Sequence, residues 1–368
     1  MRILHASTAL RARAALRPRS ELLVDRHGTL TAGDLLDQVS LLRRRSRRLT
    51  GPPRLGMLPA TAPLREVLLT VLAGDGMLEM RSSGTGGRPR LQRRGPLTGA
   101  QVRHLADLGR RIGLRRGRRI ASAAPGVHGH GLLVALGAVA VGAPLVDLSH
   151  LPAAERISLL HATSPALLTG VPVHLADLLR AQQELGESRD LSLDRVISGS
   201  DELSPALRAD LSREFRAQVH DVYGTTETGV LAVDGRPLRG VHLRAVDGRL
   251  HARSPFTGGR ELVTDRGEVA ADGTVHVTGR AEVPSSLGGL LHDPAEVRQL
   301  LLEQPGVLAV RLRPVPDARA GVRTLAEVLV DGSTDRPRPG EDEIRALVRD
   351  RLSAAAMPRE VRISSPGR

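Results

Sequence analysis

RIASAAPGVHGHGLLVALGAVAVGAPLVDL, residues 119–148, is the stretch of sequence that decides the fold class. Two short apolar runs, 119–124 and 144–148, have the length of buried strands, and the apolar run 131–141 between them has the length of a helix. The alternation continues downstream, with strands expected at 165–169 and 195–198 and helices at 173–184 and 204–216. Alternating strands and helices pack in layers around a parallel sheet, so the sequence predicts an α/β fold.

The regions on either side of this alternation are simpler. Upstream, we expect helices at 30–49, 63–74 and 101–115 and a strand at 77–80. After Tyr223, Asp-Gly pairs separate short apolar runs, and Asp-Gly is a strong signal for a hairpin turn. These pairs lie at 234–235, 247–248 and 272–273. The sequence therefore predicts a layered, parallel-sheet N-terminal domain over residues 1–280 that ends in a small β-rich subdomain.

A second, small α+β domain is expected at residues 281–368. Asp293 and Pro294 begin a helix, because Asp is a good N-cap and Pro fits the first helical turn. The remaining elements expected in this domain are strands at 307–313, 324–330 and 360–364 and a helix at 341–353.

Composition excludes several classes of function. The chain has no Cys, which excludes disulfide scaffolds, thiolate metal sites and Cys nucleophiles. Two Phe, one Tyr and no Trp are too few rings to stack on a series of bases. No apolar run approaches the ~20 residues of a membrane span, and the N-terminal sequence lacks the apolar core of a signal peptide. We therefore expect a cytoplasmic protein with no membrane span.

Charge is distributed unevenly along the chain. All 53 basic residues are Arg, and the net charge is +13. Residues 1–120 hold 25 Arg against 8 acidic residues, so the positive excess lies in this part. Such an excess favours a polyanionic partner, either nucleic acid or a nucleotide with a phosphorylated cosubstrate. Codon use in a GC-rich genome is an alternative explanation for much of the Arg.

Three segments carry residue types that suit a nucleotide. The first is the loop Ser82-Ser83-Gly84-Thr85-Gly86. Its backbone N–H groups and hydroxyls are suited to phosphate oxygens, although the Gly-Lys-Ser/Thr of a Walker A loop is missing. An ordinary flexible loop is the alternative interpretation.

The second segment is Tyr223-Gly224-Thr225-Thr226-Glu227. The Tyr223 ring is suited to covering a purine, the Thr226 hydroxyl to donating to a phosphate, and the Glu227 carboxylate to holding Mg²⁺ through oxygen ligation. A turn with one exposed carboxylate explains the same residues equally well.

The third segment runs from Asp265 through Asp272-Gly273 to Gly279-Arg280. A ribose diol needs an acceptor such as the Asp265 carboxylate, and the Arg280 guanidinium supplies donors of fixed geometry. Taken alone, an Asp and an Arg at this separation are more simply interpreted as a surface pair.

In order and in most intervals, these segments resemble the adenylate-forming superfamily, above all its acyl-CoA synthetase branch. The loop at 82–90 resembles the motif Ser/Thr-Ser-Gly-Thr-Thr-Gly-x-Pro-Lys, and residues 223–227 match the family's Tyr-Gly-Thr-Thr-Glu without change. Residues 199–201 resemble the adenine-side loop, and His128 resembles the His at the start of a helix beside the acyl pocket. The resemblance covers residues 80–365.

The resemblance implies a reaction in two steps that uses ATP, Mg²⁺ and coenzyme A. A carboxylic acid attacks the α-phosphate of ATP, and the acyl-adenylate then passes to a thiol, either that of coenzyme A or that of a carrier protein. The family further implies a mobile C-terminal domain that turns about a hinge residue, here Glu282. The residues around the implied acyl pocket are mostly small or aliphatic, which is compatible with a medium aliphatic acid and with a role in fatty acid metabolism.

Site roles are carried over residue by residue, with Thr226, Glu227, Arg280 and His128 expected to take part in catalysis. The resemblance implies phosphate contacts by Ser82, Ser83, Gly84, Thr85, Gly86 and Thr226, adenine-side contacts by Gly199, Ser200, Asp201, Tyr223 and Gly224, ribose contacts by Asp265 and Arg280, Mg²⁺ ligation by Glu227, and an acyl-pocket wall at His128.

The sequence also departs from the family. Residues 1–80 are shorter than the usual N-terminal stretch, and the family's C-terminal catalytic Lys is missing, because the chain has no Lys. Two enzyme-level interpretations follow: a ligase that uses Arg instead, either Arg368 or one from the basic N-terminal part, or a degenerate relative that binds nucleotide with little turnover. Binding to nucleic acid is a third interpretation, less favoured because charge alone supports it.

Overall fold

The computed structural model describes residues 2–4, 6–49, 54–59, 61–74, 78–82, 90–184, 191–201, 203–279, 285–287, 290–292, 294–305, 307–317, 321–330, 339–352 and 356–364. The chain divides into two compact units. The first consists of Met1–Met80 with Leu91–Ala281, and the second of Arg81–Arg90 with Glu282–Arg368.

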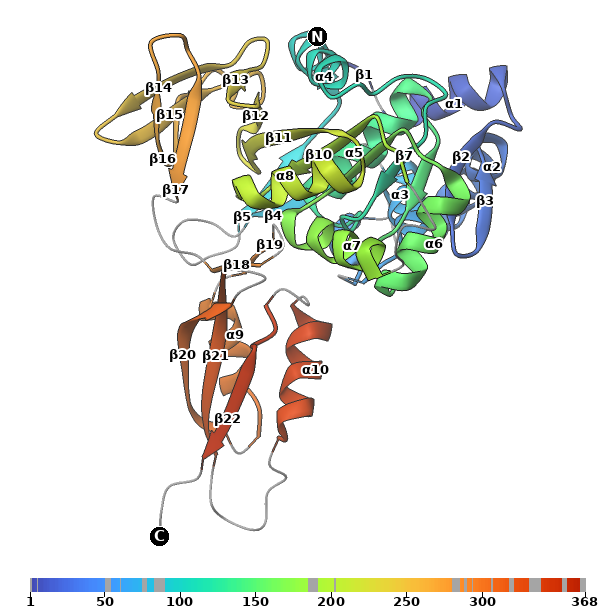
Figure 1. Ribbon diagram of the computed structural model, residues 1–368. Coiled ribbons are helices and arrows are strands. Elements are labelled where there is room, and N and C mark those ends of the chain that lie inside the picture. Colours follow the sequence, from blue (N-terminus) through green and yellow to red (C-terminus); the bar gives the residue numbers. More distant parts are fainter. Residues whose placement is uncertain are drawn as a thin grey trace. The chain divides into compact units, whose positions relative to one another are not determined.

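A nine-stranded sheet forms the centre of the first unit (Figure 1), in the order β13-β12-β11-β10-β9-β7-β8-β2-β3. Its strands are β2 (Glu21–Asp25), β3 (Gly28–Thr31), β7 (Ile120–Ser122), β8 (Leu145–Asp147), β9 (Leu167–Gly170), β10 (Arg195–Gly199), β11 (Gln218–Thr225), β12 (Gly229–Val233) and β13 (Arg236–Pro237). Every neighbouring pair from β11 to β2 is parallel, and β12, β13 and β3 add antiparallel pairs at the two edges. The predicted α/β fold with a parallel sheet is confirmed.

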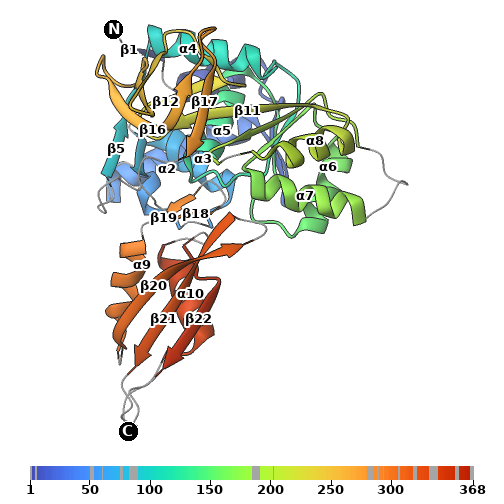
Figure 2. The same ribbon diagram turned by 60° about the vertical axis from the view of Figure 1, so that its left-hand side comes forward.

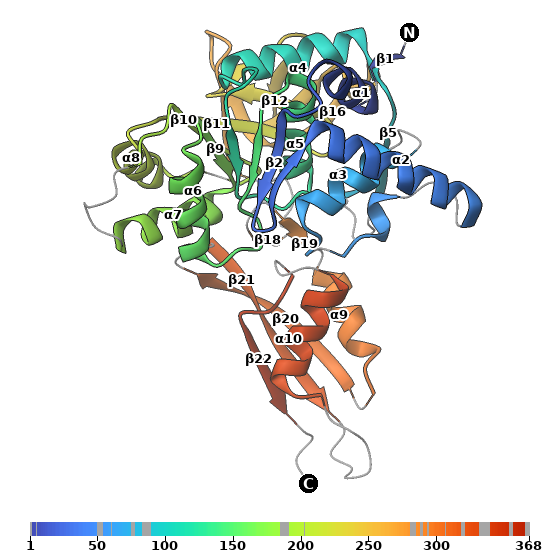
Figure 3. The ribbon, with the colours of Figure 1, turned by 90° about the vertical axis from the view of Figure 1, so that its right-hand side faces the viewer.

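Helices cover both faces of this sheet, as Figure 3 shows. On one face lie α1 (Ala6–Leu16), α2 (Ala32–Leu49), α3 (Leu64–Ala73) and α5 (Gly129–Val141), and on the other lie α6 (Ala153–Thr163), α7 (Pro172–Glu184) and α8 (Pro205–Glu214). Successive strand residues alternate between the two cores: Ile120 packs into the first and Ala121 into the second. Burial on both faces explains why these strands read as continuous apolar runs.

The remaining elements of the first unit are short or antiparallel. They are β1 (Arg2–Leu4), which pairs with β6 (Leu97–Thr98); α4 (Gly99–Arg111); the 3₁₀ helix η1 (Leu55–Met57); and an antiparallel sheet of β14 (His242–Val246), β15 (Arg249–Arg253), β16 (Leu262–Val269) and β17 (Val275–Gly279). A separate pair is formed by β4 (Leu78–Ser82) and β5 (Arg90–Arg94). The sheet β14–β17 is the expected β-rich part.

Two of the predicted hairpin turns have the backbone conformation that Asp-Gly favours. Asp234 and Gly235 have φ of 49° and 72°, and Asp247 and Gly248 have φ of 50° and 70°. Positive φ at both central residues is the type I′ turn, whose twist matches that of the flanking strands. The turns join β12 to β13, where Val233 pairs with Arg236, and β14 to β15, where Val246 pairs with Arg249.

The second unit is a small α+β structure (Figure 2). It consists of the pair β18 (Ser285–Leu287) and β19 (Leu290–His292), a sheet of β20 (Val307–Asp317), β21 (Gly321–Val330) and β22 (Glu360–Ser364), and the helices α9 (Pro294–Leu302) and α10 (Glu341–Arg351). Both helices contribute to one core against the sheet, with Val297 and Leu301 from α9 and Ile344 and Val348 from α10. The elements expected after residue 293 are all present.

Some elements were not predicted from the sequence. The hairpin β2–β3 has only a short apolar run before its turn, and α6 lies in a stretch with charged residues at its start. Within the part of the chain that the structure describes, no helix is long and apolar enough to cross a membrane.

Candidate nucleotide site

The parallel pairing of β10 with β11 places two predicted segments at one edge of the sheet. In this register Gly199 lies opposite Val222, so the turn at Ser200, which follows β10, lies beside Tyr223 at the point where the pairing of β10 with β11 ends. Carboxyl ends of parallel strands are the usual ligand-binding edge of an open α/β sheet. A Cβ on Gly199 would lie 3.0 Å from the Val222 carbonyl oxygen and 3.2 Å from His130 Nδ1, so this position has little room for a larger residue.

Tyr223 is hydrogen-bonded to the segment that the sequence predicts as the ribose contact. Its hydroxyl donates to Asp265 Oδ2 at 3.0 Å and lies 3.0 Å from the Thr264 hydroxyl oxygen. Burial and the negative charge of Asp265 raise the pKa of Tyr223, so the phenol stays protonated at neutral pH. The structure thus brings together an aromatic ring and a carboxylate from two segments about forty residues apart, as the resemblance implies for Tyr223 and Asp265.

The rest of the Tyr-Gly-Thr-Thr-Glu motif forms the tip of the β11–β12 hairpin. Thr225 and Thr228 bond across the tip, with Thr228 N–H donating to Thr225 Oγ1 at 3.2 Å and their hydroxyl oxygens 3.0 Å apart. A Cβ on Gly224 would lie 2.5 Å from the Gly229 carbonyl oxygen, which explains glycine at this position. The backbone of the tip is therefore fixed by its own residues, and Thr226 and Glu227 project from it half-buried.

The backbone of the tip is held from outside as well. The Ser254 hydroxyl donates to the Thr228 carbonyl at 2.6 Å. Arg94, on β5, donates from Nη2 to the Thr226 carbonyl, and its guanidinium carbon lies 4.8 Å from the centre of the Phe256 ring. Burial lowers the pKa of Arg94, and the negative charge of Glu227 opposes this effect. The sequence contains no signal for Arg94, because it is one of many Arg in the basic N-terminal third.

Two histidines lie at the start of α5, after strand β7. Burial and the charge of His150 lower the pKa of His128, the helix N-cap, to about 4. Burial also lowers the pKa of His130 to about 4, and its Nε2 lies 2.7 Å from the Thr169 hydroxyl on β9. Both rings are therefore neutral at pH 7. His128 was selected from the sequence; His130, which contacts the Gly199 position, was not.

Several predicted site residues lie outside the described residues. These are Ser83, Gly84, Thr85 and Gly86 of the Gly-rich loop, Arg280, and the hinge residue Glu282. Ser82 is described only as the last residue of β4. Among the described residues, no group of three or more His, Asp or Glu side chains forms a metal cluster.

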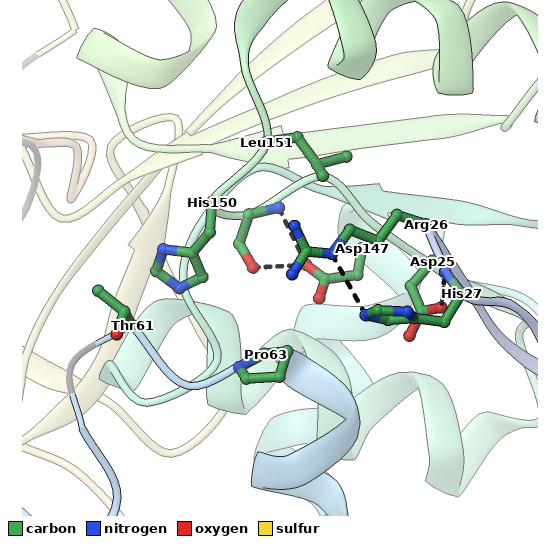
Figure 4. A pocket seen from close by; sticks show the side chains of 9 residues that line it. Asp25, Arg26, His27, Thr61, Pro63, Asp147, His150 and Leu151 are labelled. Atoms are coloured by element: carbon green, nitrogen blue, oxygen red, sulfur yellow. Dashed lines mark hydrogen bonds between the residues drawn. The ribbon is translucent and has the colours of Figure 1, made fainter.

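A separate polar pocket lies at the same edge of the sheet, where β2 and β8 end (Figure 4). Asp147 accepts hydrogen bonds there from the Leu64 amide at 3.1 Å and from the amide and hydroxyl of Ser149 at 2.9 and 2.6 Å. Asp25 forms an ion pair with Arg65 at 2.9 Å. These carboxylates hold the first turn of α3 and the β2–β3 hairpin, so their role is structural. The pocket is lined by Asp25, Arg26, His27, Thr61, Pro63, Asp147, Ser149, His150 and Leu151.

Comparison with known proteins identifies the class. Residues 80–254 match the family of AMP-binding enzymes. Residues 80–254 are therefore similar to an AMP-binding enzyme domain, in agreement with the resemblance to the adenylate-forming superfamily that the motifs predict.

Among curated relatives, a probable 2-succinylbenzoate–CoA ligase of Mycobacterium tuberculosis is 33% identical over 193 residues, 46% of this chain and 49% of the relative. A 3-oxocholest-4-en-26-oate–CoA ligase of Rhodococcus rhodochrous is 35% identical over 101 residues, 26% of this chain and 17% of the relative. The chain thus spans about half, or less, of the length of these curated relatives.

Solved structures share the fold at low sequence identity. The amide bond synthetase of Marinactinospora thermotolerans has a TM-score of 0.73 at 19% identity, with 98% of this chain and 96% of that chain covered. The o-succinylbenzoate CoA synthetase of Bacillus subtilis has a TM-score of 0.71 at 17% identity, with 97% and 94% covered. The chain therefore has the same fold as these two enzymes.

Proposed function

We propose that the chain activates a carboxylic acid with ATP and transfers the acyl group to the thiol of coenzyme A. In the first step a carboxylate oxygen attacks the α-phosphorus, and the bond to pyrophosphate breaks. In the second step the thiol sulfur attacks the acyl carbon, and AMP leaves. The observation that carries the proposal is the hydrogen bond from Tyr223 to Asp265 beside the Tyr-Gly-Thr-Thr-Glu hairpin, within a chain whose residues 80–254 match the AMP-binding enzymes.

The chain's residues act mainly by positioning in this proposal. Tyr223 covers the adenine and fixes the carboxylate of Asp265, which accepts the ribose hydroxyls. The Thr226 hydroxyl donates to a phosphate oxygen at the hairpin tip. The neutral rings of His128 and His130 line the acyl side without adding a charge beside the reacting carboxylate. Positioning and electrostatic stabilisation are the main catalytic contributions expected for transfer at phosphorus.

The donors at the hairpin tip fit Mg²⁺. The Glu227 carboxylate and the Thr226 hydroxyl are hard oxygen donors, and Mg²⁺ is usually bound by one or two carboxylates together with substrate phosphates. A single protein carboxylate is therefore sufficient for this ion. When bound, Mg²⁺ supplies positive charge that offsets the charge of the phosphates.

Under this proposal, the acids for which the relatives are named indicate the class of substrate to test. The two curated relatives are named for ring-containing carboxylic acids, 2-succinylbenzoate and 3-oxocholest-4-en-26-oate. A test panel should therefore combine such acids with medium aliphatic acids, to which the sequence alone points. Localisation in the cytoplasm is part of the same proposal.

Exchange of labelled pyrophosphate into ATP, measured acid by acid, tests the first step. Detection of the CoA thioester by mass spectrometry tests the second. We expect exchange to depend on both the acid and Mg²⁺. ATP binding without exchange for any acid would contradict the ligase and support the degenerate relative.

A further inference from the structure

Arg94 is a half-buried cation whose guanidinium lies beside the hairpin tip. Its Nε is buried and has no hydrogen-bond partner, and among the described residues Glu227 is the acid whose charge acts on the guanidinium. A buried charge without a paired carboxylate is costly unless another interaction compensates. The Phe256 ring supplies part of this compensation through a cation–π contact, with the guanidinium carbon 4.8 Å from the ring centre. A neutral side chain would fill the same space at lower cost, so packing alone does not explain an Arg here.

The hydrogen bond from Arg94 to the Thr226 carbonyl fixes the orientation of the whole Thr226–Glu227 peptide. In a trans peptide the carbonyl and the following N–H point in opposite directions. Holding the Thr226 carbonyl toward Arg94 therefore directs the Glu227 N–H away from Arg94. The same peptide carries the hydroxyl of Thr226 on one side and the carboxylate of Glu227 on the other, so its rotation would displace both.

Two independent sets of hydrogen bonds hold this peptide. Thr225 and Thr228 close the hairpin through their own hydroxyls and amides. Arg94 comes from β5, more than a hundred residues earlier, and holds the peptide between them. The first set maintains the turn, and Arg94 sets the orientation of the peptide at its tip.

We propose that Arg94 is a positioning residue for the nucleotide phosphates. It orients the Thr226–Glu227 peptide and places a positive charge beside the site where the polyphosphate lies. This inference rests on the proposed function, because it takes the hairpin tip as the phosphate side of the site. It also assigns a purpose to one Arg of the basic N-terminal third in a chain without Lys.

The test compares two ligands that share a nucleoside. Calorimetric titration measures the affinity for ATP with Mg²⁺ and for adenosine in the wild type and in Arg94→Met and Arg94→Lys. We expect Arg94→Met to weaken ATP binding about tenfold or more, the usual scale for the loss of a hydrogen bond from a charged group. Adenosine affinity should stay unchanged, because Tyr223 and Asp265 are intact. Arg94→Lys should recover most of the ATP affinity.

Arg111 provides a matched control. It also donates to backbone carbonyls, those of Arg236 and Pro237 at 3.1 and 3.0 Å, beside the same sheet. Arg111→Met should leave both affinities unchanged. Thermal denaturation of every variant reports whether folding is affected.

The outcomes separate the inference from the proposed function. Equal weakening of ATP and adenosine, or no weakening of either, would overturn the role of Arg94, as would failure of the wild type to bind ATP. If the wild type binds ATP and the ligand-selective loss occurs, but no acid supports pyrophosphate exchange, Arg94 keeps its role and the ligase function fails.

Discussion

Two loops at the same edge of the parallel sheet carry carboxylates, and they differ in what those carboxylates contact. After β8, Asp147 accepts hydrogen bonds from Leu64 and Ser149, so both of its oxygens are occupied by the protein. At the β11–β12 tip, no hydrogen bond from a described residue reaches the Glu227 carboxylate, although the backbone beneath it is held by Arg94 and Ser254.

This difference in contacts distinguishes a carboxylate that stabilises the fold from one that is available to a ligand. A buried polar side chain whose acceptors are all used stabilises the fold and has no capacity left for a ligand. A side chain that projects from a fixed backbone with its oxygens uncommitted is ready to bind a ligand without reorganisation. We therefore assign the loop after β8 to the scaffold and the hairpin tip to the nucleotide.

The largest effect is expected at the hairpin tip. Glu227→Gln keeps the size of the side chain and removes its charge. We expect the rate of pyrophosphate exchange to fall by about 10²–10³, the usual cost of losing one charge-stabilising group. The melting temperature should change little, because Glu227 makes no hydrogen bond to a described residue and acts on the fold only through its charge beside Arg94. An unchanged exchange rate would contradict the assignment of the hairpin tip to the nucleotide.

A pH titration tests the region between the two loops, where His130 contacts Thr169. The folded pKa of His130, about 4, lies below its unfolded value of 6.5, so the unfolded chain takes up the proton first as the pH falls. The free energy of unfolding should therefore decrease between pH 6.5 and 4, by up to about 3 kcal/mol from this residue. Denaturant unfolding across this range measures it. His130→Gln should make the decrease smaller, and an equal decrease in both proteins would contradict the assignment.

Asp265→Ala should weaken ATP binding by about 10- to 100-fold, the range expected for losing hydrogen bonds to a charged group. Tyr223→Phe is the matched variant, since it keeps the ring and removes only the hydroxyl that donates to Asp265. It should have a smaller effect. Calorimetry with ATP measures both. A larger loss in Tyr223→Phe than in Asp265→Ala would show that the hydroxyl, rather than the carboxylate, contacts the nucleotide.

The smallest effect concerns the scaffold. Asp147→Ala should lower the free energy of unfolding by about 1–2 kcal/mol, because the Leu64 amide and the Ser149 groups lose their acceptor. Pyrophosphate exchange per folded molecule should be unchanged. Denaturant unfolding and exchange assays measure the two quantities, and Asp147→Asn, which keeps one acceptor oxygen, should lie between Ala and wild type. A loss of exchange without a loss of stability would place Asp147 in the site instead.

Much of the fold was predictable because its signals are local. The buried strands at Ile120 and Leu145 read as apolar runs, and the Asp-Gly turns require positive φ that few other pairs adopt. The hairpin β2–β3 was not predicted, because it is held by pairing with β8 and by Arg65 of α3, which lie far away in the sequence. In the site, Tyr223, Glu227 and Asp265 were found through motif order, whereas Arg94 and His130 belong to no motif.

Sequence by itself determined the alternation of strands and helices after residue 119, the positions of the Asp-Gly turns and the motifs that resemble those of AMP-binding enzymes, because each depends on residues close together in the chain. Only the tertiary structure decided which polar groups are hydrogen-bonded to other parts of the protein. Hydrogen bonds such as those of Asp147 with Leu64 and Arg94 with Thr226 join residues more than eighty positions apart, and no local pattern encodes which distant donor will meet a given acceptor.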